Sequence, residues 1–503
     1  MSDVLAGAGV LVAAAASAAA ILLPAGRPRA ALMGLALVLF PVLIFGDQWH
    51  SHQIVDLRHS TARLVFLLAV AAAAVAALAY AFRRWPVLLP LAIVAAIPFR
   101  IPLEAGGDTA NLLVPLYLVI AGGVVAVLVR DWNVAAGRRY RSDGPAGPNA
   151  VWLPRVLAAA VLLYALQSLY SVDFSKGLQN ICFFLVPFTV AYALIQDVEW
   201  DNRILRLILA VVSIEAVAFV LVGSVELASR SLFWNDAVIR SNEFHTYFRV
   251  NSVFWDPNIY GRYLALVLVV VTTALLWTQG KRDFWLLAGT ILVLWFGLGQ
   301  TFSESSFLAL LAGLAVLAAI RWSGRWALAA VVVGAVGAVL VVTLVGGKSL
   351  NASNLLDRAN VVTGGRAKLV TGGVELFGER PLWGYGSGSF QHAYADHREN
   401  KNLPVSVSHT EPVTVAAEQG LIGLAAYLAL IVVALWVMTA GLQGRRAGRA
   451  AVLAAFVALL VHTLAYAGFF EDPTTWILLA IGTALAATPF VPPPVPAAVR
   501  DPA

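Results

Sequence analysis

A dense group of ionisable residues occupies one connecting segment of this 503-residue chain, residues 346–420. The segment holds seven Lys or Arg residues, seven Asp or Glu residues and three of the eight histidines, His392, His397 and His409. Histidine exchanges protons near neutral pH, and arginine binds oxyanions through its planar fork of N–H groups. The segment therefore has the residue types for proton transfer and anion binding. Because its charges balance, individual positions must carry that chemistry.

A second polar group lies within thirteen residues near the N-terminus and comprises Asp47, His50, His52, Asp56 and His59. A His-x-His pair on an extended segment could ligate zinc or manganese. A polar loop at a membrane interface explains the same residues, and we favour the loop and predict no metal site. The one cysteine, Cys182, excludes a disulfide framework and a cysteine-based zinc or iron–sulfur centre.

The elements that must position these residues are membrane-spanning helices. Hydrophobic residues make up 60% of the chain and charged residues only 12%, with a mean hydropathy of +0.81. An average soluble domain has about 25% charged residues, so a soluble fold is excluded. Apolar runs inside lipid can satisfy their backbone only as helices. Fifteen such runs occur, at residues 4–23, 29–46, 62–81, 86–99, 111–129, 151–169, 178–195, 204–223, 259–277, 284–299, 305–320, 326–345, 421–439, 450–467 and 475–490.

We predict an all-α polytopic membrane protein with about 12–15 transmembrane helices, because the runs 86–99 and 305–320 are short enough to be re-entrant. Basic residues cluster in alternate short connections: Arg27 and Arg29; Arg83 and Arg84; Arg130, Arg138, Arg139 and Arg141; Lys281 and Arg282; Arg321 and Arg325; Arg445, Arg446 and Arg449. Since Lys and Arg are retained in the cytoplasm, the long connections 224–258 and 346–420 are predicted to face outside. The net charge of +6 reflects this orientation rather than nucleic-acid binding.

On this topology the chain divides into four parts. Residues 1–345 form an N-terminal transmembrane bundle that includes the extracytoplasmic loop 224–258. Residues 346–420 form a large extracytoplasmic loop, and residues 421–490 form the C-terminal transmembrane helices. The Pro-rich tail 491–503 is predicted to be disordered and cytoplasmic.

Several short motifs follow one another in the second half of the chain. They are Gly365-Arg366, Glu375-Leu376-Phe377, the stretch Pro381-Leu382-Trp383-Gly384-Tyr385-Gly386-Ser387-Gly388-Ser389-Phe390, His409-Thr410, and Glu418-Gln419-Gly420-Leu421-Ile422-Gly423-Leu424. An upstream stretch, residues 249–258, contains Arg249 and ends in Pro-Asn at the mouth of an apolar run. In order and spacing, these motifs resemble the O-antigen ligase/polymerase family of polytopic membrane glycosyltransferases, over about residues 170–485.

The resemblance implies a GT-C-like helical enzyme with a large extracytoplasmic loop. Its reaction would transfer a glycan, with inversion, from an undecaprenyl-diphosphate carrier to an acceptor hydroxyl on the outer face of the cytoplasmic (inner) membrane. Such a donor already has a good leaving group, so catalysis needs charge stabilisation of the diphosphate and a base for the hydroxyl. The resemblance implies His409 as general base, Arg366 and Arg249 as diphosphate clamps, and Glu418 as a residue that orients the site. It implies no metal and no cofactor.

Simpler interpretations of these residues stay open. His409 fits a solvated loop histidine, Arg366 a charge on an exposed loop helix, and Arg249 a residue that snorkels at the membrane interface. With the motifs taken into account, we favour the catalytic interpretation for His409 and Arg366, and weigh the two interpretations equally for Arg249. Glu418 is expected to be structural rather than catalytic.

One segment departs from the family pattern. Family members commonly carry a Ser-Arg-Gly-like string at the end of a span, whereas residues 301–306 here read Thr-Phe-Ser-Glu-Ser-Ser. Arg262 and Arg380 are the candidates for the missing cation, and we group Arg380 with the donor-binding residues. Downstream, Gly384, Gly386 and Gly388 predict a tight turn, with a phosphate-cradling nest as the alternative.

Two other functions compete with the ligase-like one. A polymerase that extends a glycan on the same carrier needs the same clamp and base. A small-solute transporter should carry ionisable residues inside its spans, where only Glu215 and His462 are found. We therefore expect an enzyme whose partners are the lipid bilayer, a lipid-linked glycan donor and a glycan, glycolipid or protein acceptor, with its active site facing the periplasm or the cell exterior.

Overall fold

The computed structural model describes residues 3–49, 55, 59–105, 108–133, 149–244, 247–325, 366–397, 407–440, 442 and 447–487. Within these ranges, ten helical units are long and apolar enough to cross a membrane. They are α1 (Asp3–Leu22), α2 (Arg27–Asp47), α4 (Thr61–Arg84), α6 (Val114–Asn133), the continuous unit of α8 (Phe174–Asn180), η1 (Ile181–Leu185) and α9 (Val186–Gln196), α10 (Asn202–Ser229), α12 (Pro257–Trp277), α13 (Lys281–Thr301), α14 (Glu304–Arg321) and α19 (Glu411–Thr439). The prediction of a polytopic helical membrane protein is confirmed.

Shorter helices complete the bundle and its loops. Three of them are apolar, α7 (Trp152–Ser168), α20 (Ala447–Thr463) and α21 (Pro473–Ala487). The others are α5 (Leu88–Ala96), α11 (Asp236–Phe244), α17 (Arg366–Glu379) and α18 (Phe390–Asp396). The predicted span 326–345 and the tail 491–503 lie outside the described residues.

The run 86–99 forms only the short helix α5. Nine residues rise about 14 Å, which is too short for a hydrocarbon core of about 30 Å. The chain then turns back through an antiparallel hairpin, β1 (Ile101–Ala105) and β2 (Asp108–Leu112), with Ile101 opposite Leu112. This small hairpin is an addition to the predicted all-α architecture, and it places Arg100 between α5 and β1.

The unit formed by α8, η1 and α9 contains one turn of π-helix. Pro187 has no N–H, and its ring would clash with the carbonyl of residue 183 in a regular α-helix. The wider turn at Ile181–Leu185 removes that clash, and the N–H of Val186 bonds to the carbonyl of Ile181 instead. The span therefore continues through its proline without a break.

Small residues set how closely the helices of the core pack. Helix α14 packs against α12 and α20, while α1 packs against α2 and α7. A Cβ atom on Gly313 of α14 would lie 2.5 Å from Val269 on α12 and 3.2 Å from the carbonyl oxygen of Ala454 on α20. Glycine at this position lets three helices approach at one point, as is common between membrane helices.

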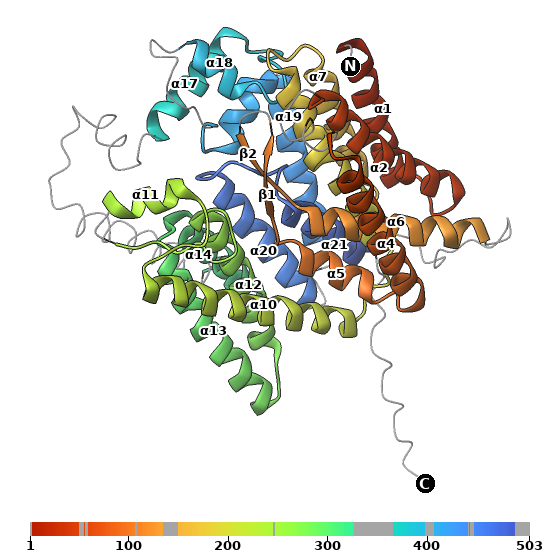
Figure 1. Cartoon of the computed structure of the whole chain (residues 1–503). Helices are drawn as coiled ribbons and strands as arrows, with labels where there is room; N and C mark the ends of the chain where they lie inside the picture. Colours follow the sequence, from red (N-terminus) through yellow and green to blue (C-terminus); the bar gives the residue numbers. More distant parts are fainter. Residues whose placement is uncertain are drawn as a thin grey trace, which may run out of the picture.

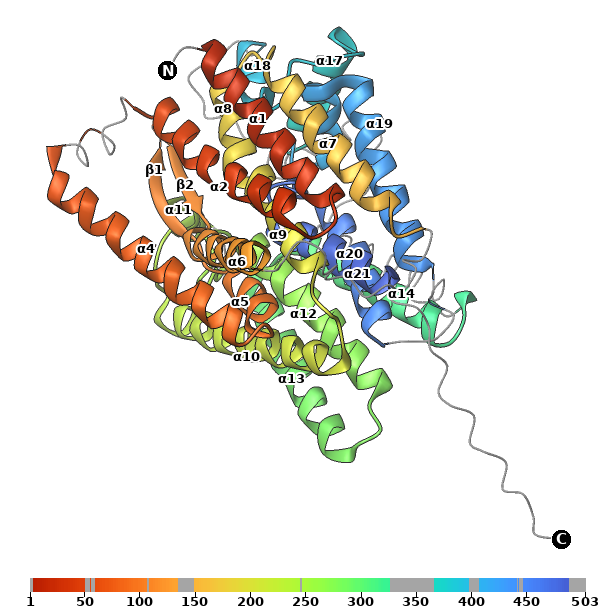
Figure 2. The same cartoon turned by 90° about the vertical axis from the view of Figure 1, so that its right-hand side faces the viewer.

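Contacts join some of the connections that are predicted to share a side of the membrane. At one end, Arg29 forms a 2.6 Å ion pair with Asp197, and Arg27 donates to the carbonyl of Trp132. At the other end, Ser175 donates to Asp47 at 2.9 Å. Helices α17 and α18 lie at the same end of the molecule as the start of α1 in both views (Figures 1 and 2).

Candidate active site

The site begins at the first residues of α12. Asp256 caps this helix, its Oδ1 accepting the N–H of Asn258 at 2.6 Å, and a proline occupies the first helical position. The Oδ1 atom of Asn258 then accepts two further hydrogen bonds, from Arg249 Nη2 at 3.1 Å and from Ser303 Oγ at 3.0 Å. Arg249 also donates Nε to the carbonyl of Thr301 at 3.0 Å. The predicted clamp Arg249 is thus held between the start of α12 and the end of α13.

Serines at the start of α14 continue the polar cluster inward. Ser303 Oγ lies 2.7 Å from Ser306 Oγ, and Ser305 Oγ lies 3.2 Å from His462 Nε2 on α20. This requires a close approach of α12 and α14, because a Cβ on Gly261 would lie 2.6 Å from Ser306 Oγ. The segment that lacks the family's arginine is therefore a buried hydroxyl cluster.

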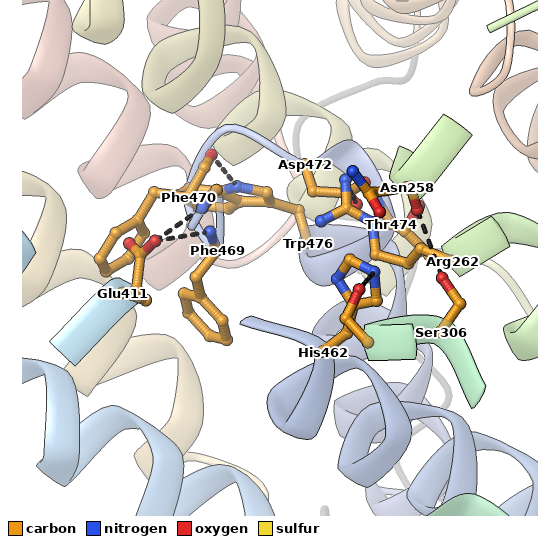
Figure 3. Close-up of polar contacts among 12 residues, drawn as sticks. Asn258, Arg262, Ser306, Glu411, His462, Phe469, Phe470, Asp472, Thr474 and Trp476 are labelled. Carbon is orange, nitrogen blue, oxygen red and sulfur yellow. Dashed lines mark hydrogen bonds and ion pairs between the residues drawn. The ribbon is translucent and has the colours of Figure 1, made fainter. Parts of the chain in front are cut away.

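Arg262 supplies a cation beside this cluster. Its side chain is 5% exposed and forms a 2.7 Å ion pair with Asp472, also buried, in the connection between α20 and α21 (Figure 3). Its Cζ lies 5.9 Å from the ring centroid of Tyr466 in the same connection. Its Nη1 atom is buried and has no hydrogen-bond partner among the described residues. A guanidinium whose Nη1 has N–H groups without an acceptor can bind an anionic ligand.

Arg100 adds a second positive charge at this place. Burial lowers the pKa of Arg100; the charge of Arg262 acts in the same direction, whereas Asp472 and Tyr466 oppose it. An arginine stays protonated despite such a shift. The neighbourhood therefore contains two guanidinium groups, Arg262 and Arg100, both of which interact with the carboxylate of Asp472.

His409 reaches the same cluster through Tyr466. The two ring centroids are 6.2 Å apart, and the ring of His462 is 5.8 Å from that of Tyr466. His409 is half-buried and has the uncommon left-handed backbone conformation, with φ of 62°. Tyr466 therefore links the predicted base, His409, to the cation Arg262.

A buried carboxylate holds this arrangement in place. Glu411, two residues after His409, accepts the N–H groups of Gly468 at 2.7 Å and Phe469 at 3.1 Å (Figure 3). These hydrogen bonds tie the start of α19 to the connection that carries Tyr466. The position of His409 is thus coupled to that connection by backbone contacts.

Glu418 holds the predicted glycine turn. Its carboxylate accepts the N–H of Gly388 at 2.8 Å and that of Phe390 at 3.1 Å, and its carbonyl accepts the N–H of Gly386 at 2.7 Å. Gly384, Gly386 and Gly388 all have positive φ, as a tight turn of this kind requires. The N–H groups of the turn bind an anion, but that anion is the protein's own carboxylate.

The other two predicted cations lie elsewhere. Arg366 is the first residue of α17, and its side chain lies outside what the structure describes. Arg380 is exposed, with its Cζ 4.3 Å from the ring centroid of Tyr385. It belongs to an outer cluster in which Tyr385 and His397 both bond to the Glu379 carboxylate. Of the two candidates for the missing cation, Arg262 rather than Arg380 lies beside the polar cluster.

Sequence reasoning did not single out four members of the site, which are Arg100, Glu411, Tyr466 and Asp472. A lone cation directly after a short apolar run was the available signal for Arg100. The adjacent acidic residues Glu471 and Asp472, between the last two apolar runs, were the available signal for Asp472. No sequence motif around Glu411 or Tyr466 indicates a role, because the residues that they contact are distant in the sequence.

The first outer loop is described only in part. Asp47 ends α2 and accepts hydrogen bonds from Ser175 and Gln179. His50, His52 and Asp56 lie outside the described residues, so the interpretation of this group as an interfacial loop stays a prediction.

Comparison with known proteins identifies the region that carries His409. The family model described as O-Antigen ligase matches residues 289–428, from the second half of α13 into α19. No curated protein matches the chain. The match includes the serine cluster, His409, Glu411 and Glu418, and it confirms the resemblance found in the motifs.

Proposed function

We propose that this chain is an inverting glycosyltransferase of the O-antigen ligase type that uses an undecaprenyl-diphosphate glycan as donor. Residues 289–428 match the family model described as O-Antigen ligase, which supports the proposal. The observation that carries the proposal is the buried guanidinium of Arg262. Its Nη1 has no hydrogen-bond partner among the described residues, and Arg100 is a second cation. Arg262 and His409 both contact Tyr466. Cations for a diphosphate and a base for a hydroxyl are what this transfer needs.

The reaction is a single displacement. The acceptor O–H gives its proton to His409 while its oxygen bonds to the anomeric carbon of the donor sugar. The bond from that carbon to the diphosphate oxygen breaks on the opposite face, and its electron pair leaves with the diphosphate. Inversion at the anomeric carbon follows from this geometry.

The arginines stabilise the charge that develops on the leaving diphosphate. Arg262 is held by its ion pair with Asp472, so it loses little side-chain entropy when the ligand binds. Arg100 interacts electrostatically with Arg262 and Asp472. Arg249 contacts the edge of the serine cluster through its hydrogen bond to Asn258. Burial strengthens each of these interactions compared with water, which is why a few fixed donors can lower the barrier.

The proposed location is the outer face of the cytoplasmic membrane. Arg29 pairs with Asp197 at the end of the bundle that we expect to be cytoplasmic, and the site lies at the starts of α12 and α14 and the end of α20. By the rule that basic connections stay in the cytoplasm, the site then faces the periplasm or the cell exterior. The acceptor would be a glycan, a glycolipid or a protein reached from that side.

A test uses purified protein in liposomes with a synthetic undecaprenyl-diphosphate sugar. Replacement His409→Ala should reduce transfer by about 10²-fold or more, because a positioned base contributes at least that factor. The control is His392→Ala, an exposed histidine on α18 whose loss should leave transfer unchanged. Undiminished turnover of the His409 variant would reject the assigned base. Sugar uptake into the liposomes without any transfer would favour the transporter.

The same preparation separates a ligase from a polymerase. A ligase yields one glycan on a separate acceptor, whereas a polymerase yields a ladder of longer glycans on the carrier. Both reactions would use the same cations and base, so this comparison concerns the acceptor and leaves the donor site as proposed.

A further inference from the structure

An exposed apolar patch lies where the turn formed by residues 381–385 meets α7 and α19. It consists of Leu169 and Tyr170 directly after α7, Leu382 and Trp383 in the turn, and Leu421 in α19. Leu382 is 58% exposed and Trp383 is 57% exposed. Neighbouring exposed side chains of this size mark a surface that contacts a partner or a membrane.

The backbone of this turn finds its hydrogen-bond partners within the protein. Four consecutive carbonyls accept hydrogen bonds: that of Arg380 from the N–H of Gly384, that of Pro381 from the N–H of Leu421, that of Leu382 from the N–H of Ile422, and that of Trp383 from the hydroxyl of Tyr170. A loop surrounded by water needs no such partners, because water donates to its carbonyls. Irregular backbone at the edge of lipid does need them.

The length of α19 places the turn at the edge of the hydrocarbon core. The helix is interrupted at Gly420, which has φ of 65° and ψ of −162°. The part from Leu421 to Thr439 rises about 28 Å at about 1.5 Å per residue, close to the thickness of about 30 Å of a hydrocarbon core. A Cβ atom on Gly420 would lie 2.4 Å from the carbonyl oxygen of Leu382. The turn therefore lies level with one end of the segment that crosses the core.

The patch also continues an exposed face of α19. The exposed side chains on this face recur at the spacing of one side of a helix, and they are Leu421, Ala425, Leu428, Val432 and Trp436. All of them are apolar, as the lipid-facing side of a membrane-spanning helix requires. Leu382 and Trp383 extend this face beyond the break at Gly420. Continuity with a lipid-facing surface favours lipid over a partner protein.

Aromatic side chains border this face at both ends. Helix α7 packs against α19, and the two lie side by side in Figure 2. Tyr170 and Trp383 are exposed at one end of this pair of helices, and Trp152 and Trp436 are exposed at the other. Tyrosine and tryptophan are enriched at the two interfaces of a bilayer. The positions of these four residues fit both interfaces.

We infer that Leu382 and Trp383 are inserted into the interfacial region of the membrane, in the leaflet nearer α17 and α18. On the predicted orientation this is the outer leaflet. Part of the connection 346–420 is then seated in the bilayer rather than in water. Because Glu418 bonds to Gly388 and Phe390, directly after the turn, insertion fixes the height of α18 above the membrane. The inference does not depend on which reaction the protein catalyses.

The test measures how deep a spin label lies in vesicles of phosphatidylethanolamine and phosphatidylglycerol. It compares collisions of the label with oxygen, which concentrates in lipid, and with a nickel chelate, which stays in water. The one cysteine, Cys182, is buried, and Cys182→Ser provides a background without a thiol. In that background Leu382→Cys carries the label and keeps Trp383. Leu428→Cys on α19 is the lipid control, and His392→Cys on α18 is the water control.

The ratio of oxygen to nickel collisions at position 382 should lie above that at position 392 and below that at position 428. Adding Trp383→Ser should lower the ratio at position 382 toward that at position 392, without a change in melting temperature, because Trp383 is exposed. Adding Trp383→Tyr should retain the ratio, since tyrosine also favours the interface.

Three outcomes would overturn the inference. A ratio at position 382 equal to that at position 392 would show that the turn lies in water. Few collisions with either reagent would show that a second copy of the chain or another segment covers the patch. A ratio that Trp383→Ser leaves unchanged would show that Trp383 does not hold the turn in the membrane.

Discussion

Replacing Arg262 tests whether this guanidinium acts in the reaction or only in folding. Its side chain is 5% exposed and that of its partner Asp472 is 7% exposed, with 2.7 Å between their charged atoms. The variant Arg262→Gln leaves the Asp472 carboxylate buried without its paired cation. Breaking a buried pair in this way costs about 3–5 kcal/mol of unfolding free energy. The cost should lie at the lower end, because Arg100 also attracts Asp472.

The double variant Arg262→Gln/Asp472→Asn separates the two roles. It removes both charges, so the carboxylate is no longer buried unpaired, and most of the lost stability should return. Catalysis should not return, because the donor that binds the leaving diphosphate is still missing. Loss of one such preorganised donor reduces kcat by about 10²–10³.

Two measurements on the same detergent-solubilised preparations distinguish a catalytic role of Arg262 from a role in folding alone. Thermal unfolding gives the stability of the wild type, the single variants and the double variant, and transfer from an undecaprenyl-diphosphate sugar gives kcat. The expected pattern is stability restored and turnover still low in the double variant. If turnover recovers together with stability, Arg262 serves the fold alone and the diphosphate assignment is refuted.

Three further changes follow from the geometry. Glu418→Gln should lower the unfolding free energy by about 1–3 kcal/mol, because an amide is a weaker acceptor than a carboxylate for the two buried N–H groups. Thermal melting measures this change, and an unchanged melting temperature would contradict it. Gly261→Ala should cost about 1–3 kcal/mol and reduce transfer, since its Cβ would lie 2.6 Å from Ser306 Oγ; full activity at wild-type stability would argue against the tight α12–α14 contact. Hydrogen bonding to Tyr385 lowers the pKa of Glu379, and a backbone hydrogen bond to Ala393 raises that of His397. The Glu379 carboxylate therefore stabilises the contact of α17 with α18 fully above pH 4.5, and this stabilisation is lost as the pH falls through its lowered pKa. The His397 imidazolium stabilises the same contact fully below pH 6.5, and this stabilisation is lost as the pH rises through its raised pKa. The hydrogen-exchange protection factors of residues 390–397, which are the rates corrected for the intrinsic pH dependence of exchange, should thus be highest between about pH 4.5 and 6.5 and lower on both sides. Protection factors that do not change with pH would show that the pair contributes nothing.

Arg380 lies in the outer cluster, and its role in donor binding stays a prediction. It follows Glu379 in a loop rich in charges, and its planar cation packs over Tyr385. Nothing in the local sequence distinguishes such a residue from one that faces a ligand. Only the position of the loop relative to α12 and α20 does so.

The sequence by itself determined the class of the protein and most of its helices. An apolar content of 60% cannot be covered by polar surface, and lipid-embedded backbone must be helical, so the spans follow from composition alone. The spacing of cations along the chain predicted which connections lie together. The motif around His409 identified the family segment, since its residues are close together in the sequence.

The tertiary structure decided which residues meet at the site. Ser305 and His462 are 157 positions apart, and Gln167 donates to the carbonyl of Gln419 across 252 positions. Arg262 lies on an apolar stretch and gains its significance only from Asp472 and Tyr466 on another connection. Helix periodicity shows which face of a helix is apolar, but not which other helix will cover it. The choice of Arg262 over Arg380 therefore depends on how the helices pack, because that packing brings a buried charge next to its partner.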